Sequence, residues 1–404
     1  MKYIIILGDG MADRPIAELG NKTPLMAANT PNIDELCRKG RCGRLITVPD
    51  DMPPGSEIAN MAVLGYDVKK VYQGRGVLEA ASMGIELEDT DIAMRCNLIC
   101  IENEKIKNHS AGHISNVEAK ELITVLQDKL ETEKVKFYPG VSYRHLLVIK
   151  GEKNNVKCTP PHDVPGSLFK DVLVKPVDDD VALSNLLNNL IFKSQEILSK
   201  HPVNQKRVSE GKDPANSIWP WSPGIKPKMK TLQELYGVSG AMISAVDLLY
   251  GIGKYAGMKA VKVKGSTGLY TTNYEGKAKA AVDALKEVDL VYLHIEASDE
   301  AGHEGDYELK KKTIEYLDSR VVKYIMKETA KMDEPVTIAL IPDHPTPCDI
   351  KTHTRDAVPF IIFKPDNAAD SVLEYNEESV NEGYYGTLKG NGFMLALLNT
   401  QNEN

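Results

Sequence analysis

Three apolar stretches of the sequence end in residues that could bind metal ions. The residues are Asp9 after 2–7, Asp299 and His303 after 288–295, Asp343 and His344 after 336–341, and His353 in the loop that follows. Carboxylate and imidazole ligands together suit Mn²⁺, Zn²⁺ or Fe²⁺, whereas Ca²⁺ and Mg²⁺ prefer all-oxygen shells. Taken alone, each residue also fits a helix cap, a helix-surface pair or a turn. Their common position after predicted strands favours a site for two metal ions, which suits phosphoryl transfer.

A serine that could act as the nucleophile lies in the segment 53–60, PPGSEIAN. The Pro-Pro-Gly turn before Ser56 and the apolar residues after it predict a helix that starts here. The residue could be only the N-cap of that helix, because serine is a preferred N-cap. The two roles are compatible, since a helix N-terminus also stabilises a phosphate group carried by that serine.

The elements that must position these residues are typical of an α/β fold. The three stretches are mostly apolar and of strand length, which fits a parallel sheet covered on both faces. Helical patterns at Glu275–Glu287 and Tyr307–Thr329 alternate with them, and this predicts a doubly wound, mostly parallel sheet. Functional groups gather at the carboxyl ends of the strands in such sheets. One helical turn would also place Asp299 and His303 on the same face.

The middle of the chain has a different pattern from its two ends. Between about 86 and 229 the candidate strands are short, a Lys- and Glu-rich helix is predicted around Glu118–Glu133, and residues 201–230 form a long Pro/Gly/polar stretch. We therefore expect a discontinuous catalytic domain of residues 1–85 and 230–404. Residues 86–229 would be an inserted α+β domain.

The composition excludes several classes of protein. The 404 residues include 49 Lys and Arg and 57 Asp and Glu, for a formal net charge of −8. This charge, with both signs dispersed, argues against a nucleic-acid binder that acts through bulk positive charge. No apolar run approaches the roughly 20 residues of a membrane span, and the N-terminus lacks a signal-peptide pattern. Six scattered cysteines favour reduced thiols, so we expect a cytoplasmic protein.

In their order and in the sequences around them, the candidate residues resemble the cofactor-independent phosphoglycerate mutases of the archaeal type, a branch of the alkaline phosphatase superfamily. The matching segments are GDGMADRP, ANTPNID, PPGSEIANMAVLGYD, DEAGHEGD, PDHPTP and KTHT, and the resemblance extends over nearly the whole chain. It implies an alkaline-phosphatase-like fold with two metal sites. One ion would be held by Asp299, His303 and His353, and the other by Asp9, Ser56, Asp343 and His344.

The resemblance also implies the activity and the cofactors. Ser56 would take the phosphoryl group from 3-phosphoglycerate, and the retained glycerate would recover it on its other hydroxyl to give 2-phosphoglycerate. Two divalent ions, Mn²⁺ or Zn²⁺, would support this exchange, and no 2,3-bisphosphoglycerate would be needed. The inserted domain would be the lid that retains the glycerate. The expected partner is a small phosphorylated metabolite.

Substrate recognition should involve arginines, whose planar guanidinium binds carboxylates and phosphates in a bidentate manner. Arg95 and Arg144 stand where the family has arginines. The family's DRRAGRI segment is NHSAGHI here, so that His113 stands in place of an arginine, and an arginine expected near WPWSPG is absent. Lys254 is a further candidate for contact with the transferred phosphoryl group. The GIGK sequence that ends at this lysine also fits a helix C-cap.

These departures leave other functions open. The segments PHD, HPVN and IWPW are similar to a subgroup proposed to be homoserine kinases, which would transfer a phosphoryl group from a nucleotide through the same serine. The chain has no Walker G-x-x-x-x-G-K-[ST] motif, but a phosphatase-type site needs none. Trp219-Pro220-Trp221 fits either a rigid loop packed on the inserted domain or a cap that faces the substrate. A simple phosphomonoesterase and a non-catalytic binding protein are the remaining alternatives.

Overall fold

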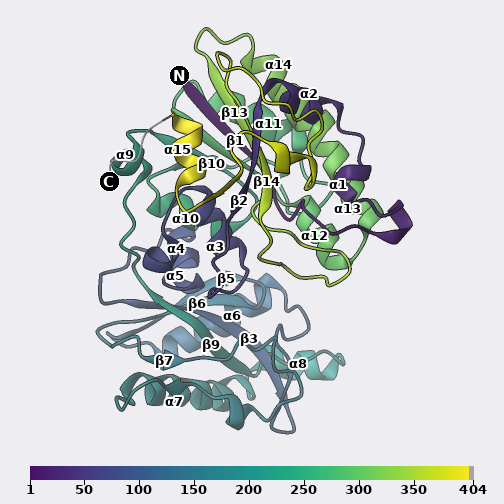
Figure 1. Ribbon diagram of the computed structural model, residues 1–404. Helices are drawn as coiled ribbons and strands as arrows, with labels where there is room; N and C mark the ends of the chain where they lie inside the picture. The colour runs from purple at the N-terminus through teal and green to yellow at the C-terminus, as the bar shows by residue number, and fades with distance from the viewer. Residues whose placement is uncertain (400–404) are drawn as a thin grey trace. The chain divides into compact units, whose positions relative to one another are not determined.

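The computed structural model describes residues 1–399 and divides the chain into two units (Figure 1). The first is formed by Met1–Tyr72 together with the chain from Met229 onward, and the second by Gln73–Lys228. The domain boundaries expected from the sequence, after residues 85 and 229, stay a prediction. In the structure, α5 (Arg75–Ser82) contacts the strands β3 (Ile92–Glu102) and β9 (Ser217–Ile225) of the second unit.

An eight-stranded sheet forms the centre of the first unit. In spatial order its strands are β11 (Lys259–Ala260), β10 (Gly240–Ile243), β12 (Leu290–Ile295), β1 (Lys2–Gly8), β13 (Val336–Ile341), β14 (Val358–Phe363), β2 (Arg41–Ile46) and β15 (Thr387–Lys389). Neighbouring strands are parallel except at β14, which runs antiparallel to β13 and β2. The α/β class with a mostly parallel sheet is therefore confirmed.

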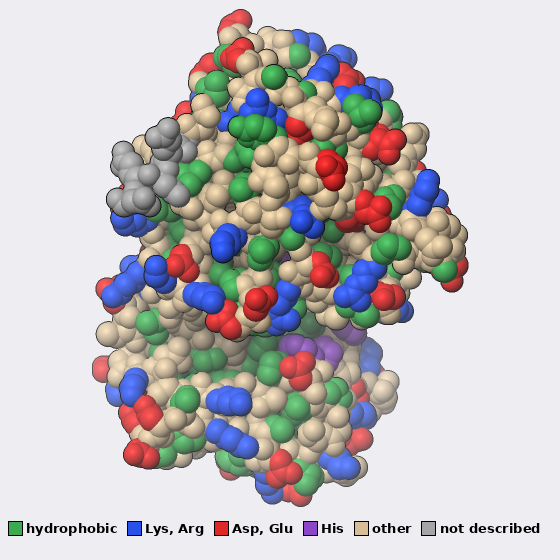
Figure 2. Space-filling view, viewed as in Figure 1, with side chains coloured by type: hydrophobic (Ala, Val, Ile, Leu, Met, Phe, Trp, Pro, Cys, Tyr) green, Lys and Arg blue, Asp and Glu red, His purple; other side chains and the backbone are tan. Residues whose placement is uncertain are grey.

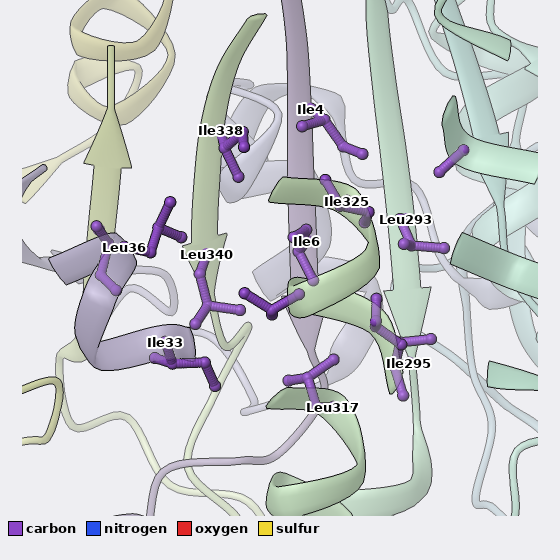
Figure 3. Close-up of a cluster of buried hydrophobic side chains, with 14 of the residues drawn as sticks. Ile4, Ile6, Ile33, Leu36, Leu293, Ile295, Leu317, Ile325, Ile338 and Leu340 are labelled. Carbon is purple, nitrogen blue, oxygen red and sulfur yellow. The ribbon is translucent and has the colours of Figure 1, made fainter. Parts of the chain in front are cut away.

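One face of this sheet is covered by long helical segments. They are α2 (Pro31–Lys39), α11 (Tyr274–Ala284) and a continuous stretch of α13 (Tyr307–Tyr316), a π-helical turn (Leu317–Val322) and α14 (Lys323–Thr329). Figure 3 shows Ile4 and Ile6 of β1 and Leu340 of β13 close to Leu317 and Ile325 of this stretch. The helical pattern predicted at Tyr307–Thr329 is thus present, and its apolar residues form the buried face.

The opposite face is covered by α3 (Ser56–Val63) and α10 (Asp247–Tyr255). Successive strand residues point to opposite faces, and Ile5 of β1 is as fully buried as its neighbours. A Cβ atom on Gly253 of α10 would lie 3.1 Å from Met242 Cβ of β10, so glycine allows close packing there. The other helical elements of this unit are α1 (Pro24–Ala27), α4 (Val68–Val71), α9 (Leu232–Tyr236), α12 (Ala297–Glu304), α15 (Gly392–Leu398) and the 3₁₀ turns Ala17–Leu19 and Ser379–Glu382.

The second unit is an antiparallel sheet with helices packed on it. Strand β3 pairs with β6 (Arg144–Ile149) on one side and with β9 on the other, and β4 (Lys105–Asn108) and β5 (Val135–Val141) extend the sheet. The helices α6 (Asn116–Leu130) and α7 (Ala182–Leu198) contribute to its apolar core. The smaller elements are β7 (Val156–Lys157), β8 (Lys175–Pro176), α8 (Pro202–Ser209) and the 3₁₀ turn Phe169–Val172.

The Pro/Gly/polar stretch at 201–230 contains α8 and β9, so the interpretation of Trp219-Pro220-Trp221 as a rigid loop is wrong. Trp219 and Trp221 both lie in β9 with buried side chains. Their indole N–H groups donate to Thr159 O at 2.9 Å and to Asn97 Oδ1 at 3.0 Å. Pro220 is tolerated between them because β9 pairs with β3 at the edge of the sheet.

The distribution of surface charges and the state of the cysteines match what the composition indicates. Charged side chains of both signs are mixed over the face shown in Figure 2. Within residues 1–399, no helix combines the length and the apolar character required to cross a bilayer. The six cysteines are free thiols, as the sequence predicted.

Candidate functional site

The register of the sheet brings the ends of three neighbouring strands to one level. Strand β1 lies between β12 and β13, with Gly8 opposite Ile295 and Leu7 opposite Ile341. The ligand-type residues that follow these strand ends are therefore neighbours in space. Two groups, each with its ligand atoms within 4.8 Å of one another, could hold a metal ion: Asp299 with His344 and His353, and Asp9 with Asp343 and His344.

Asp299, in the first turn of α12, lies between two imidazoles. Its Oδ2 atom lies 3.3 Å from His303 Nε2, and its Oδ1 atom lies 3.4 Å from His353 Nε2. The two Nε2 atoms are 2.9 Å apart. His303 Nδ1 lies 3.0 Å from Lys351 O, and His353 Nδ1 lies 3.2 Å from Pro54 O. These carbonyl contacts favour a proton on Nδ1, which leaves both Nε2 atoms able to bind an ion.

The second group surrounds the side chain of His344. Its Nε2 atom lies 3.3 Å from Asp343 Oδ2 and 3.7 Å from Asp9 Oδ1. The same nitrogen lies 3.2 Å from Ser56 Oγ. Ser56 is the first residue of α3, and Gly55 occupies the N-cap position. The interpretation of Ser56 as an N-cap is therefore wrong, and its hydroxyl faces His344 instead.

Burial and mutual repulsion perturb the charges of this cluster. Burial raises the pKa of Asp9, and the nearby carboxylates of Asp343 and Asp299 raise it further. Burial alone would also raise the pKa of Asp299, but hydrogen bonds from His303 and His353 lower it well below its usual range. The hydrogen bond with Asp299 in turn raises the pKa of His303 to about 9.

The donor set fits divalent transition-metal ions. Asp9 Oδ1 is buried and has no hydrogen-bond partner among residues 1–399, and an uncompensated buried carboxylate oxygen is costly. Burial lowers the pKa of His344, which favours the neutral imidazole that a metal requires. Ligand atoms about 3.3 Å apart are expected around a tetrahedral ion with bonds of about 2.0–2.1 Å.

The sequence did not reveal two buried residues that hold these ligands, Asn60 and His294. Asn60 Nδ2 donates to Asp343 Oδ2 at 2.8 Å, and the Tyr292 hydroxyl donates to Asn60 Oδ1. His294 Nε2 lies 2.8 Å from Asp9 Oδ2. A signal was present for each of them. Asn60 follows the candidate nucleophile by one helical turn, and a histidine inside an apolar strand indicates a specific polar partner.

A second buried network links the loops that follow β1 and β13. Lys310 Nζ donates to Asp13 Oδ2 at 2.7 Å and to the carbonyl oxygen of Thr346 at 2.8 Å. The Thr346 hydroxyl donates to Asp299 Oδ1. Both Lys310 and Asp13 are nearly inaccessible to solvent. Lysine on a helix gives no sign of such burial in the sequence, and for this reason the network was not expected.

Arg95, expected to bind the substrate, is held in place within the second unit. Its Nε atom lies 2.9 Å from Glu79 Oε1, and its guanidinium stacks on Trp221 with Cζ 4.3 Å from the ring centroid. The His162 ring packs edge-on against Trp221 with centroids 5.1 Å apart, and His109 lies 6.0 Å from His162. The segment NHSAGHI, which lacks the family's arginines, thus places the His109 imidazole close to the cluster of Arg95, Trp221 and His162.

The other three candidates for substrate binding have exposed side chains. Arg144 is the first residue of β6, and His113 adopts a left-handed conformation with φ of 53°. Lys254 lies in the last turn of α10. The GIGK segment is therefore inside a helix, and its interpretation as a C-cap is wrong. The role of all three residues in substrate binding stays a prediction.

Comparison with known proteins relates the chain to one family. The family model described as 2,3-bisphosphoglycerate-independent phosphoglycerate mutase matches residues 37–204. A protein of that name from Methanosarcina acetivorans is 54% identical over 400 residues, which are 98% of this chain and 100% of the relative.

Two solved structures resemble the whole chain. The PH0037 protein from Pyrococcus horikoshii has a TM-score of 0.84 and 30% identity, with coverage of 100% of this chain and 98% of that one. The cofactor-independent phosphoglycerate mutase from Thermoplasma acidophilum has a TM-score of 0.70 and 27% identity, with 99% of each chain covered. These relatives do not favour the alternative of a homoserine kinase-type phosphotransferase. The chain belongs to the 2,3-bisphosphoglycerate-independent phosphoglycerate mutase family.

Proposed function

We propose that this protein interconverts 3-phosphoglycerate and 2-phosphoglycerate in the cytoplasm, through a phosphoserine formed on Ser56. The observation that supports this most directly is the position of Ser56 Oγ, 3.2 Å from His344 Nε2 at the start of α3. The backbone N–H groups at a helix N-terminus favour a phosphate on such a serine. The names of the relatives support the substrate.

Two divalent ions, Mn²⁺ or Zn²⁺, complete the proposed site. Asp299, His303 and His353 would hold one ion, and Asp9, Ser56, Asp343 and His344 the other. When bound, the ions neutralise the carboxylates and stabilise the negative charge that develops on the transferred phosphoryl group. No 2,3-bisphosphoglycerate is required, because the serine itself carries the phosphoryl group.

The reaction consists of two phosphoryl transfers that mirror each other. Ser56 Oγ attacks the phosphorus, the bond from phosphorus to the C3 oxygen breaks, and a proton passes from the serine to glycerate. Glycerate then reorients, and its C2 hydroxyl attacks the phosphoserine while the serine oxygen leaves and regains a proton. Asn60 Nδ2 donates to Ser56 O at 2.8 Å and so fixes the turn that carries the nucleophile.

Glycerate must stay bound between the two transfers, and we assign its retention to the second unit as a lid. Arg95 suits the substrate carboxylate or phosphate, since Glu79 and Trp221 already restrict its guanidinium and little entropy is lost on binding. Arg144 and His113 would assist it. Lys254 would contact the transferred phosphoryl group.

The reaction can be tested without a nucleotide. The purified protein with Mn²⁺ and 3-phosphoglycerate, and with neither ATP nor 2,3-bisphosphoglycerate, is expected to produce 2-phosphoglycerate that phosphorus NMR detects. The same mixture with Ser56→Ala protein is the control. Release of inorganic phosphate as the only product would identify a phosphomonoesterase. No conversion by protein loaded with two metal ions would contradict the proposed function.

Metal binding should become tighter as the pH rises. Because the pKa of His303 is raised to about 9, the metal-free side chain carries a proton at neutral pH, and this proton must leave before Nε2 can bind an ion. The affinity for Mn²⁺ is therefore expected to increase by about tenfold per pH unit below that pKa. Calorimetric titrations at several pH values, in buffers with different heats of ionisation, would count the released proton. An affinity that is flat between neutral pH and pH 8.5 would contradict this assignment.

A further inference from the structure

The side chain of Asp9 has two oxygens in different environments. Asp9 Oδ2 lies 2.8 Å from His294 Nε2 of β12, and the two side chains are almost inaccessible to solvent. Asp9 Oδ1 is also buried but has no hydrogen-bond partner among residues 1–399, and it faces His344 Nε2 at 3.7 Å. One oxygen is therefore occupied by a histidine, and the other is directed into the metal cluster.

The other ring nitrogen of His294 determines which nitrogen carries the proton. His294 Nδ1 lies 3.2 Å from Ser244 Oγ. Ser244 Oγ accepts a hydrogen bond from Val246 N at 3.0 Å and keeps its own proton to donate to the histidine, while the carboxylate oxygen Asp9 Oδ2 is an acceptor for His294 Nε2. Tyr250 fixes this serine by donating to Ser244 O at 2.7 Å. With Nδ1 as an acceptor, Nε2 carries the proton and donates it to Asp9.

The sheet fixes the backbone on both sides of this contact. His294 is opposite Leu7 in the parallel pairing of β12 with β1, and Asp9 N donates to Ile295 O at 2.9 Å. Lys277, which is fully buried, donates from Nζ to His294 O at 3.2 Å. The imidazole therefore has little freedom to move relative to Asp9.

We propose that His294 is a positioning residue for the metal site, with Ser244 as the group that fixes its tautomer. It occupies Asp9 Oδ2 and so leaves Oδ1 as the oxygen offered to the ion. Strand β12 supports Asp343 in a similar way, because Tyr292, two residues earlier and on the same face, holds Asn60 against Asp343 Oδ2. This inference rests on the proposed function, since it assumes that Asp9 binds a metal ion.

The test compares two replacements of His294 in the full-length protein. His294→Leu replaces the imidazole, and with it the donor, by an apolar side chain of similar length. It should weaken one of the two Mn²⁺ sites by about 10–100-fold. His294→Gln can still donate to Asp9 and should restore most of that loss. Calorimetry and the electron paramagnetic resonance signal of free Mn²⁺ would measure both sites. The kcat of His294→Leu at saturating Mn²⁺ should fall far less than its apparent affinity for Mn²⁺.

A purely structural role would give a different result. Thr337→Val removes a buried hydroxyl from strand β13, which pairs with the other side of β1, and is the matched control, expected to leave both Mn²⁺ affinities unchanged. Urea unfolding of the metal-free variants reports any general loss of stability. Equal Mn²⁺ affinities in His294→Leu and the parent protein, or equal weakening of both sites, would overturn the proposal. A parent protein that binds no Mn²⁺ would instead contradict the metal site of the proposed function.

Discussion

Replacing Ser56 with alanine is expected to abolish phosphoryl transfer, with a fall in turnover of at least about 10⁴-fold. The hydroxyl is the proposed carrier of the phosphoryl group, and alanine has no oxygen that could replace it. The variant should still bind metal ions, more weakly at one site, because the ligand-type residues Asp9, Asp343 and His344 remain around that position. Conversion of 3-phosphoglycerate under saturating Mn²⁺ and metal content by elemental analysis would measure both effects.

A second serine at a helix N-terminus provides the control. Ser115 caps α6 through a capping box with Glu118, so that Ser115→Ala should cost about 1 kcal/mol of stability and leave turnover unchanged. Ser56 follows the N-cap residue Gly55, and its replacement should cost little stability but nearly all activity. Turnover by Ser56→Ala within tenfold of the parent protein would show that another group accepts the phosphoryl group. Similar losses of stability in both variants would indicate that Ser56 stabilises the start of α3, as Ser115 does for α6.

Much of the cluster of ligand-type residues could be predicted from the sequence because these residues follow strands directly along the chain. Asp9 and Asp343 leave neighbouring parallel strands at the same edge, and Asp299 and His303 share one helical turn. In a parallel sheet, residues that directly follow neighbouring strands lie close together at the carboxyl edge of the sheet. The sheet itself was predictable for the same reason, since buried strands are continuous apolar runs.

The supporting residues could not be predicted in this way. His294 contacts Asp9 only because β12 and β1 pair in one particular register, and a single sequence does not determine that register. Lys310 is buried because the loops after β1 and β13 enclose it, although helical lysines are usually exposed. Trp219 lies in a strand although the prolines around it interrupt the strand pattern in the sequence, because an edge strand tolerates them.

Removing the metal ions is expected to abolish activity completely and reversibly. Without them, the raised pKa of Asp9 favours its neutral form and a protonated His303 offsets Asp299, so that a carboxylate still faces a doubly charged phosphate in a buried site. Two unit charges about 4 Å apart interact by about 4 kcal/mol at an effective dielectric constant near 20. Even one such repulsion would weaken phosphate binding by about three orders of magnitude, before any loss of transition-state stabilisation is counted.

The ligand set also predicts which ions restore the activity after treatment with a chelator. Mn²⁺ or Zn²⁺ should restore it, whereas Ca²⁺ should not, because the imidazoles of His303, His344 and His353 are poor ligands for a cation that prefers oxygen. Protein treated with the chelator and returned to buffer without metal is the matched control, and elemental analysis gives its residual metal content. Full turnover with less than about 0.1 metal ion per chain would contradict a mechanism that needs the ions to offset the three carboxylates. Recovery with Ca²⁺ alone would instead show that the carboxylates bind the catalytic ions without the imidazoles.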